Sequence, residues 1–435
     1  MGIGNIIFIT LLIVATGLFL FNLSKVIRNI KLGGPANPFD KAALRWKTMA
    51  RVALGQSKMA ARPIPFFLHL FVYLGFIIVN IEVLDIAIDG VFGTHRFISG
   101  FTGQFYNFLI VSFEFLAISV IIACAIFLAR RNVIRLKRFW AREMTIWPRS
   151  DANIILCIEI ALMSAFLLMN AGDGILQGRG VEPYTMVGSF PVSSIVAAWL
   201  LDWETSSLIL LERSAWWFHI VGIFAFLNYL PYSKHFHIFL AFPNVYFSKL
   251  DPKTQFSNLE SVTNEVKLMF DPSAAPSTEL PPSKFGAKDV QDLSWKNLLD
   301  AYTCTECGRC TSECPANITG KLLSPRKIVM DTRDRLEEVG KNISKHGKDY
   351  DDGKSLLGDY ITPEELWACT TCTACIQACP VNIDPLAIIM DIRRFLVMEQ
   401  SAAPTELNNM FTNIENNGAP WQFSPSDRLN WKDEA

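Results

Sequence analysis

Charge is scarce in this sequence, and what there is nearly cancels. Only 19% of the 435 residues are charged, the net charge is -1, and 51% of the residues are hydrophobic. A chain so apolar and so weakly charged is typical neither of disordered proteins nor of proteins that coat nucleic acid. Common enzyme signatures are also missing, because no nucleophile triad, phosphate-binding loop or dinucleotide-binding glycine motif is evident. We therefore expect no bond chemistry of those kinds from this chain.

Long hydrophobic runs are what the sequence has instead. About 20 helical residues cross the roughly 30 Å hydrocarbon core of a bilayer. Residues 192–211 contain Asp202 and Glu204, so we expect an interfacial helix there. Residues 1–240 are thus predicted to form a five-helix transmembrane domain. Its predicted spans are 3–23, 66–88, 106–128, 154–169 and 216–239.

Lysine and arginine are concentrated in two loops, residues 24–65 and 129–153. By the positive-inside rule both loops are cytoplasmic, which puts the N-terminus outside and everything after about residue 240 in the cytoplasm. The first span has no basic segment before it, and Lys25 and Arg28 follow it. We therefore expect it to remain as a helix and not to be cleaved as a signal peptide.

Eight of the ten cysteines form two matching motifs, each with the spacing Cys-x2-Cys-x2-Cys-x3-Cys-Pro. In this arrangement three thiolates bind one 4Fe–4S cluster and the fourth, which precedes proline, binds the other. The first cluster is predicted to be held by Cys304, Cys307, Cys310 and Cys379. The second is predicted to be held by Cys369, Cys372, Cys375 and Cys314.

Zinc is the alternative metal, because paired Cys-x2-Cys motifs also form zinc ribbons. Zinc sites pair two cysteines with two, whereas each motif here has four cysteines followed by proline, so iron–sulfur clusters are favoured. The other cysteines, Cys124 and Cys157, lie within predicted spans and are expected to be small packing residues.

The segment between the two motifs has apolar residues at helical spacing and charge pairs four residues apart. Residues 291–400 are therefore predicted to form an α-helical ferredoxin domain with two clusters, and the whole chain to be all-α. A linker, residues 241–290, precedes it and contains a proline- and serine-rich stretch at 271–283. The polar residues 401–435 cannot form a core alone, so we expect an extended tail that binds a partner.

Histidine is rare, and five of the six histidines lie in or beside predicted spans. His219 and His237 are 18 residues apart, which is five turns of an ideal helix, so they are predicted to face the same way about 27 Å apart. Two histidines per haem b suit electron transfer because no coordination position stays open. His69 is the predicted partner of His237, and His95 is the only histidine left for His219. The alternative is that these histidines are interfacial.

The fifth histidine, His235, is 16 residues from His219 and is predicted to point to the opposite side, unless the kink at Pro231 rotates it back. Five acids lie within the spans. Glu82, Asp85 and Asp89 share one helical face, and Glu114 and Glu159 lie in the third and fourth spans.

Acids within a membrane are costly and often mark proton paths or quinone sites. We therefore predict a quinone or proton site at Glu82 and Asp85. The alternative is that some of these acids only mark the outer membrane interface.

Both halves of the chain resemble a known family. The segments "YLPYSKHFHIFLAFPNVYF", "DAYTCTECGRCTSECPANITGKLLSPRKIVMD" and "WACTTCTACIQACPVNIDPLAIIMDIRRFLVM" resemble membrane-bound iron–sulfur oxidoreductases related to heterodisulfide reductase. That group includes bacterial electron-transfer-flavoprotein:quinone oxidoreductases. The membrane half is similar to the five-helix haem-b subunit of respiratory nitrate reductase. His69, His219 and His237 match three of its four haem ligands, and Val79 stands at the fourth position.

The resemblance implies an electron-transfer subunit of a quinone-linked oxidoreductase in the bacterial inner membrane, with its iron–sulfur domain in the cytoplasm. Its cofactors would be two 4Fe–4S clusters and one or two haem b groups, with menaquinone or another quinone as substrate. Relatives often continue into cysteine-rich CCG domains, and no CCG motif occurs in this sequence. The resemblance therefore implies a separate CCG iron–sulfur subunit as partner, and an electron-transfer flavoprotein or other soluble donor.

Two other functions stay open at this point. One is a haem-free membrane anchor that recruits the ferredoxin domain and its partner. The other is a subunit of a redox-driven ion pump, which would need a continuous polar path across the bundle. The direction of electron flow is equally open.

Overall fold

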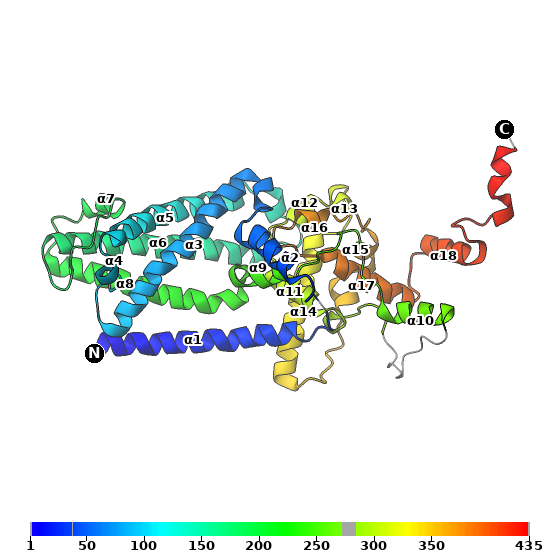
Figure 1. The fold of residues 1–435 in the computed structure, drawn as a ribbon, viewed down its shortest axis with the longest axis horizontal. Coiled ribbons are helices and arrows are strands. Elements are labelled where there is room, and N and C mark those ends of the chain that lie inside the picture. The colour runs from blue at the N-terminus through cyan, green and yellow to red at the C-terminus, as the bar shows by residue number, and fades with distance from the viewer. Residues whose placement is uncertain (1, 37, 272–283, 434–435) are drawn as a thin grey trace.

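The computed structural model describes residues 2–36, 38–271 and 284–433 and divides them into two helical parts. A bundle of long helices carries a smaller helical domain at one end (Figure 1). No β-strand occurs among these residues, so the predicted all-α class is confirmed. We call the end of the bundle that contacts the domain the docking end, and the opposite end the far end.

Five helices of the bundle are long and apolar enough to cross a membrane, as predicted. Each begins or ends beyond the predicted span. They are α1 (Ile3–Ile30), α3 (Pro63–Phe92), α5 (Gln104–Leu128), α6 (Ile146–Gly178) and α8 (Thr205–Tyr229). Short helices connect them: α2 (Ala42–Met49), α4 (Ser99–Thr102) and α7 (Ser193–Ala197).

The interfacial helix expected at residues 192–211 does not form, and that prediction was wrong. Helix α7 has only five residues, and α8 begins at Thr205 with the exposed Glu204 as its N-cap residue. A negative charge at a helix N-terminus is favourable. Inside α8, Glu212 is buried but accepts hydrogen bonds from Tyr184 and Arg213. A hydropathy average lowers the score of a span for each charged residue, whether or not that charge is paired in the fold.

Helix α6 is twice as long as its predicted span for the same reason. Asn170 and Asp173 lie beyond the predicted end and are buried. Both accept hydrogen bonds from Arg96, at 2.8 Å and 2.7 Å. Because their polar groups are paired, the helix continues to Gly178.

The fifth predicted span, residues 216–239, is interrupted. Helix α8 ends at Tyr229, and two 3-10 turns, Leu230–Tyr232 and Lys234–Phe236, lead into α9 (His237–Tyr246). Pro231 has no backbone N–H to continue the helix. His219 and His237 are therefore not on one continuous helix, and the predicted five-turn relation between them does not hold.

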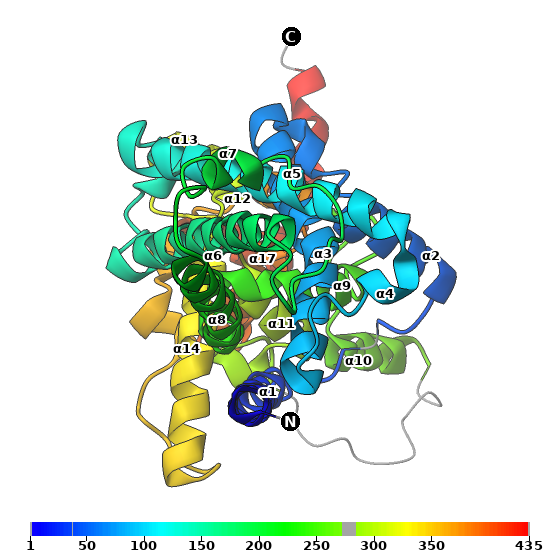
Figure 2. The ribbon, with the colours of Figure 1, turned by 90° about the vertical axis from the view of Figure 1, so that its left-hand side faces the viewer.

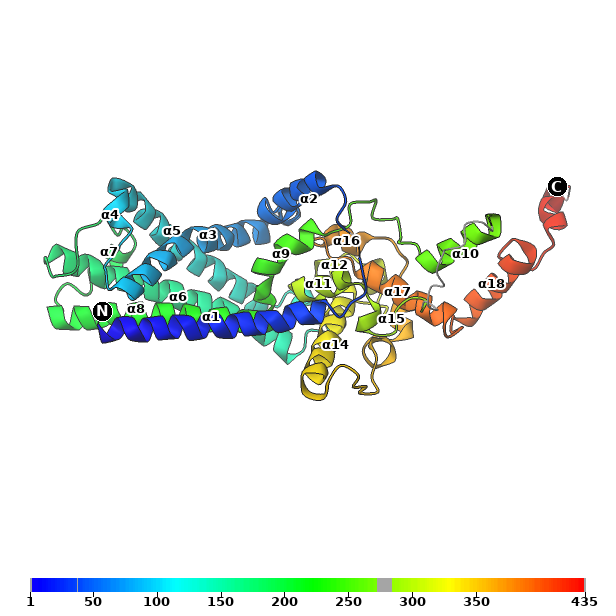
Figure 3. The same cartoon turned by 60° about the horizontal axis from the view of Figure 1, so that its bottom comes forward.

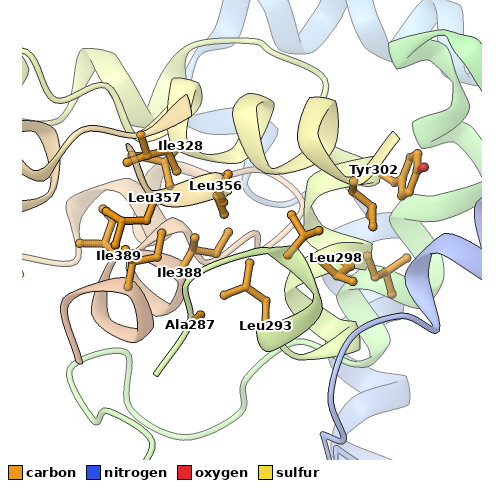
Figure 4. Packing of buried hydrophobic residues seen from close by; sticks show 14 of the residues in the cluster. Ala287, Leu293, Leu298, Tyr302, Ile328, Leu356, Leu357, Ile388 and Ile389 are labelled. Atoms are coloured by element: carbon orange, nitrogen blue, oxygen red, sulfur yellow. The ribbon is translucent and has the colours of Figure 1, made fainter. Parts of the chain in front are cut away.

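The smaller domain is built from three main helices, α11 (Trp295–Thr303), α14 (Pro325–His346) and α17 (Pro385–Met398). Their apolar faces meet in a core that includes Leu298, Ile328 and Ile388 (Figure 4). Side chains cap the N-termini of α11, α14 and α17, as expected for Ser and Asp at that position: Ser294, Ser324 and Asp384. Four short helices complete the domain: α12 (Arg309–Ser312), α13 (Pro315–Ile318), α15 (Pro363–Trp367) and α16 (Ala374–Ala378).

The domain lies against α1 and against both basic loops. Helix α1 packs along α3 and α8 and then runs on beside α14 (Figures 2 and 3). At its end Asn29 donates to the hydroxyl of Tyr302 at 2.9 Å. A Cβ at Gly340 of α14 would lie 2.4 Å from the Asn29 amide, so glycine permits this close approach.

A buried ion pair joins the second basic loop to the domain. Arg326 is fully buried and donates to Glu143 at 2.7 Å and to the carbonyl of Arg138 at 2.6 Å. Burial opposes ionisation of Glu143, but the Arg326 charge and a hydrogen bond from Ser324 outweigh it and lower the pKa of Glu143 below 4.5. The pair therefore contributes its stability above that pH and loses it as the pH falls through the lowered value.

The linker and the tail differ from a plain extended chain. The predicted linker includes the end of α9 and all of α10 (Glu260–Phe270). Its proline- and serine-rich part beyond Asp271 lies outside the described residues. The tail forms α18 (Thr405–Asn417) and a 3-10 segment (Pro425–Lys432), neither with a buried residue, and reaches away from the domain (Figure 1). The expectation of a fully extended tail was wrong; partner binding stays a prediction.

We predict that Glu143→Gln weakens docking of the domain. The substitution leaves the Arg326 charge buried without its counter-ion, which typically costs about 3–5 kcal/mol. Hydrogen exchange at the start of α14 should report the loss as faster exchange. Asp334→Asn is the control, because Asp334 is exposed and its pair with Arg333 is worth at most about 1 kcal/mol. Equal protection in both variants would contradict this account of the contact.

Candidate redox sites

The first predicted set of cysteines surrounds one small cavity. The four residues come from the loop after α11, from α12 and from the loop after α16. Backbone N–H groups already point at two of the sulfurs, from Glu306 to the Sγ of Cys304 at 3.4 Å and from Ile383 to the Sγ of Cys379 at 3.3 Å. The cavity is lined by Cys304, Cys307, Cys310 and Cys379.

The second set surrounds another cavity with the same kind of loop. It is lined by Cys314, Cys369, Cys372 and Cys375. The N–H of Thr371 donates to the Sγ of Cys369 at 3.5 Å, as Glu306 does in the first motif. Each cavity thus combines three cysteines of one motif with the fourth of the other.

Both motifs fold through the same pair of left-handed residues. Two and four positions after the first cysteine, φ is +54° at Glu306 and +71° at Gly308, and +57° at Thr371 and +61° at Thr373. Positive φ is uncommon for residues other than glycine and clusters at functional sites. The repeated turn curls each loop so that its three thiols face one point.

The donor sets fit a four-thiolate cluster. Burial raises the pKa of the free Cys304 thiol to about 12, so a thiolate at this position requires a bound cation to stabilise it. Four such groups around one cavity provide the ligands of one 4Fe–4S cluster. Iron–sulfur ligation by each set remains our proposal.

Two of the predicted haem ligands lie together at the docking end. The ring centroids of His69 and His237 are 6.3 Å apart. A metal bond to a histidine nitrogen is about 2.0 Å, so imidazoles on opposite sides of one metal have centroids roughly 6 Å apart. The Nδ1 atoms lie 3.1 Å from Gln56 Oε1 and 3.0 Å from the carbonyl of Lys234. Both rings therefore donate from Nδ1 and leave Nε2 free for a metal, the usual arrangement of a histidine ligand.

His235 also lies at the docking end. Its ring centroid is 5.6 Å from that of His237, and its Nε2 is 3.8 Å from Glu159. The kink after α8 therefore brings His235 beside the pair and does not leave it on the opposite side.

The other two predicted haem ligands are not brought together in the same way. His219 donates from Nδ1 to the carbonyl of Leu162 at 2.9 Å, and its Nε2 is buried with no hydrogen-bond partner among the described residues. Val79, at the predicted fourth ligand position, is buried in the packed cluster around Trp216. His95 instead lies 3.2 Å from Asp173. His219 is thus available as a ligand, whereas His95 is held in a different site.

That different site is a cavity of about 440 Å³ at the far end of the bundle. Arg96 connects the polar groups of this site: it is buried and donates to Glu82, Asp173 and Asn170. Burial works against the Arg96 charge, but the surrounding acids outweigh it and raise the pKa of Arg96, so its charge is secure. Trp216 and Trp217 form an aromatic part of the wall.

Two polar atoms on this cavity have no partner within the described part of the chain. They are Oε2 of Glu82, which is 2% exposed, and Nδ1 of His95. The Nε2 of His95 faces the Asp173 carboxylate, so that nitrogen donates and Nδ1 keeps a lone pair. A carboxylate oxygen and an imidazole nitrogen are thus free to bind a ligand or to accept a proton.

The remaining acids have structural partners. Asp85 accepts from the Tyr106 hydroxyl at 2.5 Å and from the N–H of Ile98. Asp89 accepts from backbone N–H groups of the loop after α3, and Glu114 accepts from the N–H groups of Val192 and Ser193 near the start of α7. Sequence reasoning missed Arg96, because one arginine in a loop carries no periodic signal.

Residues 303–383 match the family model of the 4Fe-4S dicluster domain. The chain is 28% identical to the probable iron-sulfur-binding oxidoreductase FadF of Bacillus subtilis, over 99% of this chain and 61% of that protein. It is 26% identical to the EtfAB:quinone oxidoreductase of Syntrophomonas wolfei, over 98% of this chain and 59% of that protein. It therefore spans about 60% of the length of these two relatives.

A shorter match covers the ferredoxin part. It is 35% identical to one component of the ferredoxin/F(420)H(2)-dependent CoB-CoM heterodisulfide reductase of Methanosarcina acetivorans, over 24% of this chain and 52% of that component. No solved structure matches the chain significantly. The chain is thus a homologue of iron–sulfur oxidoreductases of the EtfAB:quinone oxidoreductase and heterodisulfide reductase kind, with a 4Fe-4S dicluster domain beside five helices able to cross a membrane.

Proposed function

We propose that this protein passes single electrons between a cytoplasmic partner and a membrane quinone. The observation that carries the proposal is the docking of the first cysteine set against the end of the bundle where His69 and His237 lie. Arg62, directly before α3, donates to Ser312 at 2.7 Å and to Glu313 at 2.9 Å. Lys234 pairs with the buried Glu306. These contacts hold the domain where a short electron path is possible.

The contacts also support an order for the proposed path. Lys58 of the first basic loop joins that loop to the first set: it donates to the carbonyl of Cys379, and its own carbonyl accepts from Arg309. The second set is joined to the first by α12 and α16, which pack together. We therefore place it after the first set on the path that leads away from the bundle. We propose that electrons pass between partner, second cluster, first cluster and bundle, in either direction.

Within the bundle, His69 and His237 would hold one haem b. A bis-histidine haem supplies one-electron chemistry without an open coordination position. The protein positions both imidazoles through their Nδ1 hydrogen bonds to Gln56 and Lys234. His219 offers one ligand for a second haem. The alternative, a haem-free anchor, does not require the two Nδ1 hydrogen bonds or the 6.3 Å spacing of the rings.

The quinone end of the path is proposed at the far-end cavity. Reduction of a quinone takes two electrons and two protons, so its site needs groups that exchange protons. Glu82 and His95 each present one free atom to the cavity, and Asp173 contacts the other ring nitrogen of His95 at 3.2 Å. Asp85 supports the site through Tyr106 and the loop after α3. The same two free atoms would serve a proton path.

Partners and location are proposed from the surface of the molecule. The exposed tail carries Phe411, Trp421 and Trp431, and exposed aromatic residues suit a protein interface. We propose that it binds a CCG-type iron–sulfur protein, with an electron-transfer flavoprotein or another soluble donor upstream. Both basic loops lie at the docking end, which supports a bacterial inner-membrane protein with its ferredoxin domain in the cytoplasm.

Haem content tests the proposed function most simply. We expect the purified protein to contain haem b, and His237→Ala to lose the docking-end haem while iron bound to the clusters is unchanged. Pyridine haemochrome and metal analysis of the same sample measure both. His346→Ala is the control, because His346 is exposed and lies far along α14. Haem-free unmodified protein would support the plain anchor, and equal haem in both variants would exclude His237 as a ligand.

The exchange of ligands between the motifs has its own test. We expect Cys314→Ser to damage the cluster held by Cys369, Cys372 and Cys375 and to spare the one held by its sequence neighbours. Electron paramagnetic resonance of the reduced protein resolves the two clusters. Cys124→Ser, a buried cysteine of α5, is the control. Loss of the first cluster instead would show that the assignment is wrong.

The far-end site predicts a selective loss of quinone chemistry. Glu82→Gln removes a proton acceptor, and general acid–base groups typically contribute about 100-fold or more. We expect quinone-dependent reoxidation of the reduced clusters to slow by about 100-fold. Glu159→Gln is the control, because Glu159 is a half-buried acid of the same bundle that does not line the cavity. Equal rates in both variants would exclude Glu82 from the reaction.

A further inference from the structure

One short loop contacts both the proposed haem and the proposed first cluster. Residues 55–58, which we call the coupling loop, connect the π-turn Ala50–Leu54 to the 3-10 turn Met59–Ala61. Gln56 contacts His69, and Lys58, two residues on, contacts Cys379. From the sequence, this loop is predicted only to be part of the basic segment 24–65.

Gln56 is fixed by its surroundings. Its side chain is buried, with 7% exposed, and its φ of +48° lies in the left-handed region. A residue other than glycine is held there only when neighbouring contacts determine it. Its Oε1 accepts from the Nδ1 of His69 at 3.1 Å. An acceptor on the far nitrogen makes the imidazole a more basic metal ligand.

Lys58 places a positive charge at the edge of the first cysteine set. Its ammonium donates to three neutral oxygens: the carbonyl of Cys379 at 2.8 Å, the carbonyl of Ile376 at 3.2 Å and Oδ1 of Asn382 at 2.8 Å. The carbonyl of Lys58 in turn accepts from Arg309 at 3.2 Å. Because Arg309 stands between Cys307 and Cys310, the loop holds both halves of the first set.

We propose that the coupling loop tunes the one-electron step between the first cluster and the haem, with Lys58 and Gln56 as positioning residues. This inference rests on the proposed function. Reduction adds one negative charge to the cluster and forms or breaks no bond. The Lys58 charge stabilises that added charge and raises the midpoint potential of the cluster. The Gln56 acceptor stabilises the ferric haem and lowers its midpoint potential.

A purely mechanical role for Lys58 makes a different prediction. Its three hydrogen bonds also tie down the carbonyl end of α16, which contacts both clusters' loops. If Lys58 only holds the domain against the bundle, its loss would shift the midpoint potentials of both clusters alike. If its charge acts on the first cluster, only that cluster changes.

The experiment is a potentiometric titration of both clusters by electron paramagnetic resonance in the full-length protein. We expect Lys58→Met to shift the first cluster to lower potential and to leave the second unchanged. Lys253→Met is the matched control, since Lys253 bonds the exposed Gln377 on the same helix. Lys58→Gln keeps a hydrogen-bond donor without the charge, so it gives the same test should Lys58→Met fail to hold its clusters. An unchanged first cluster, or equal shifts in both, would overturn the proposal.

Gln56 is tested on the haem spectrum and potential. Gln56→Gly removes the acceptor while tolerating the left-handed backbone, and should shift the haem to higher potential. Gln56→Glu strengthens the acceptor and should shift it lower. No movement in either variant would overturn this half of the inference. If the unmodified protein contains no haem, the proposed haem site is wrong. The effect of Lys58 on the first cluster is still tested, because that measurement does not depend on haem.

Discussion

The contact between the ferredoxin domain and the docking end of the bundle is the interaction on which the rest of this structure depends. Electron transfer requires cofactors at short separation, and here the proposed cofactors belong to two parts of the chain that share one buried apolar cluster. Buried charge fixes the geometry: Arg326 against Glu143, and Lys234 against Glu306. Removing one partner of such a pair leaves the other charge buried without a counter-ion, which is strongly destabilising. The pairs therefore favour this one arrangement of the domain against the bundle. That arrangement brings Cys379 beside the loop that leads to His69.

The two ends of the bundle handle polarity in different ways. At the docking end, His69 and His237 direct one nitrogen to a protein acceptor and keep the other free. At the far end, Arg96 neutralises acids from two helices, and one atom each of Glu82 and His95 faces the cavity without a partner among the described residues. In an apolar bundle, unpaired polar atoms are expensive. We assign the chemistry to these two places because the free atoms there belong to side chains that bind metals or exchange protons.

The sequence predicted whatever depends on local pattern. Five helices followed from hydropathy, and each cysteine set, predicted from its spacing, lines one cavity. Features that depend on distant partners were missed. The start of α8 requires knowing that Tyr184 pairs with Glu212, and the length of α6 requires Arg96. His95 was assigned to a haem because spacing alone cannot reveal its contact with Asp173.

The central claim is that the two parts form one electron path. Rapid mixing of the fully reduced protein with a membrane quinone, followed by freeze-quenching, would test it directly. The account predicts that the bundle haem and both clusters are reoxidised, the second cluster last. Haem that reoxidises while both clusters remain reduced would contradict it, because the docked domain would then have no electronic connection to the membrane.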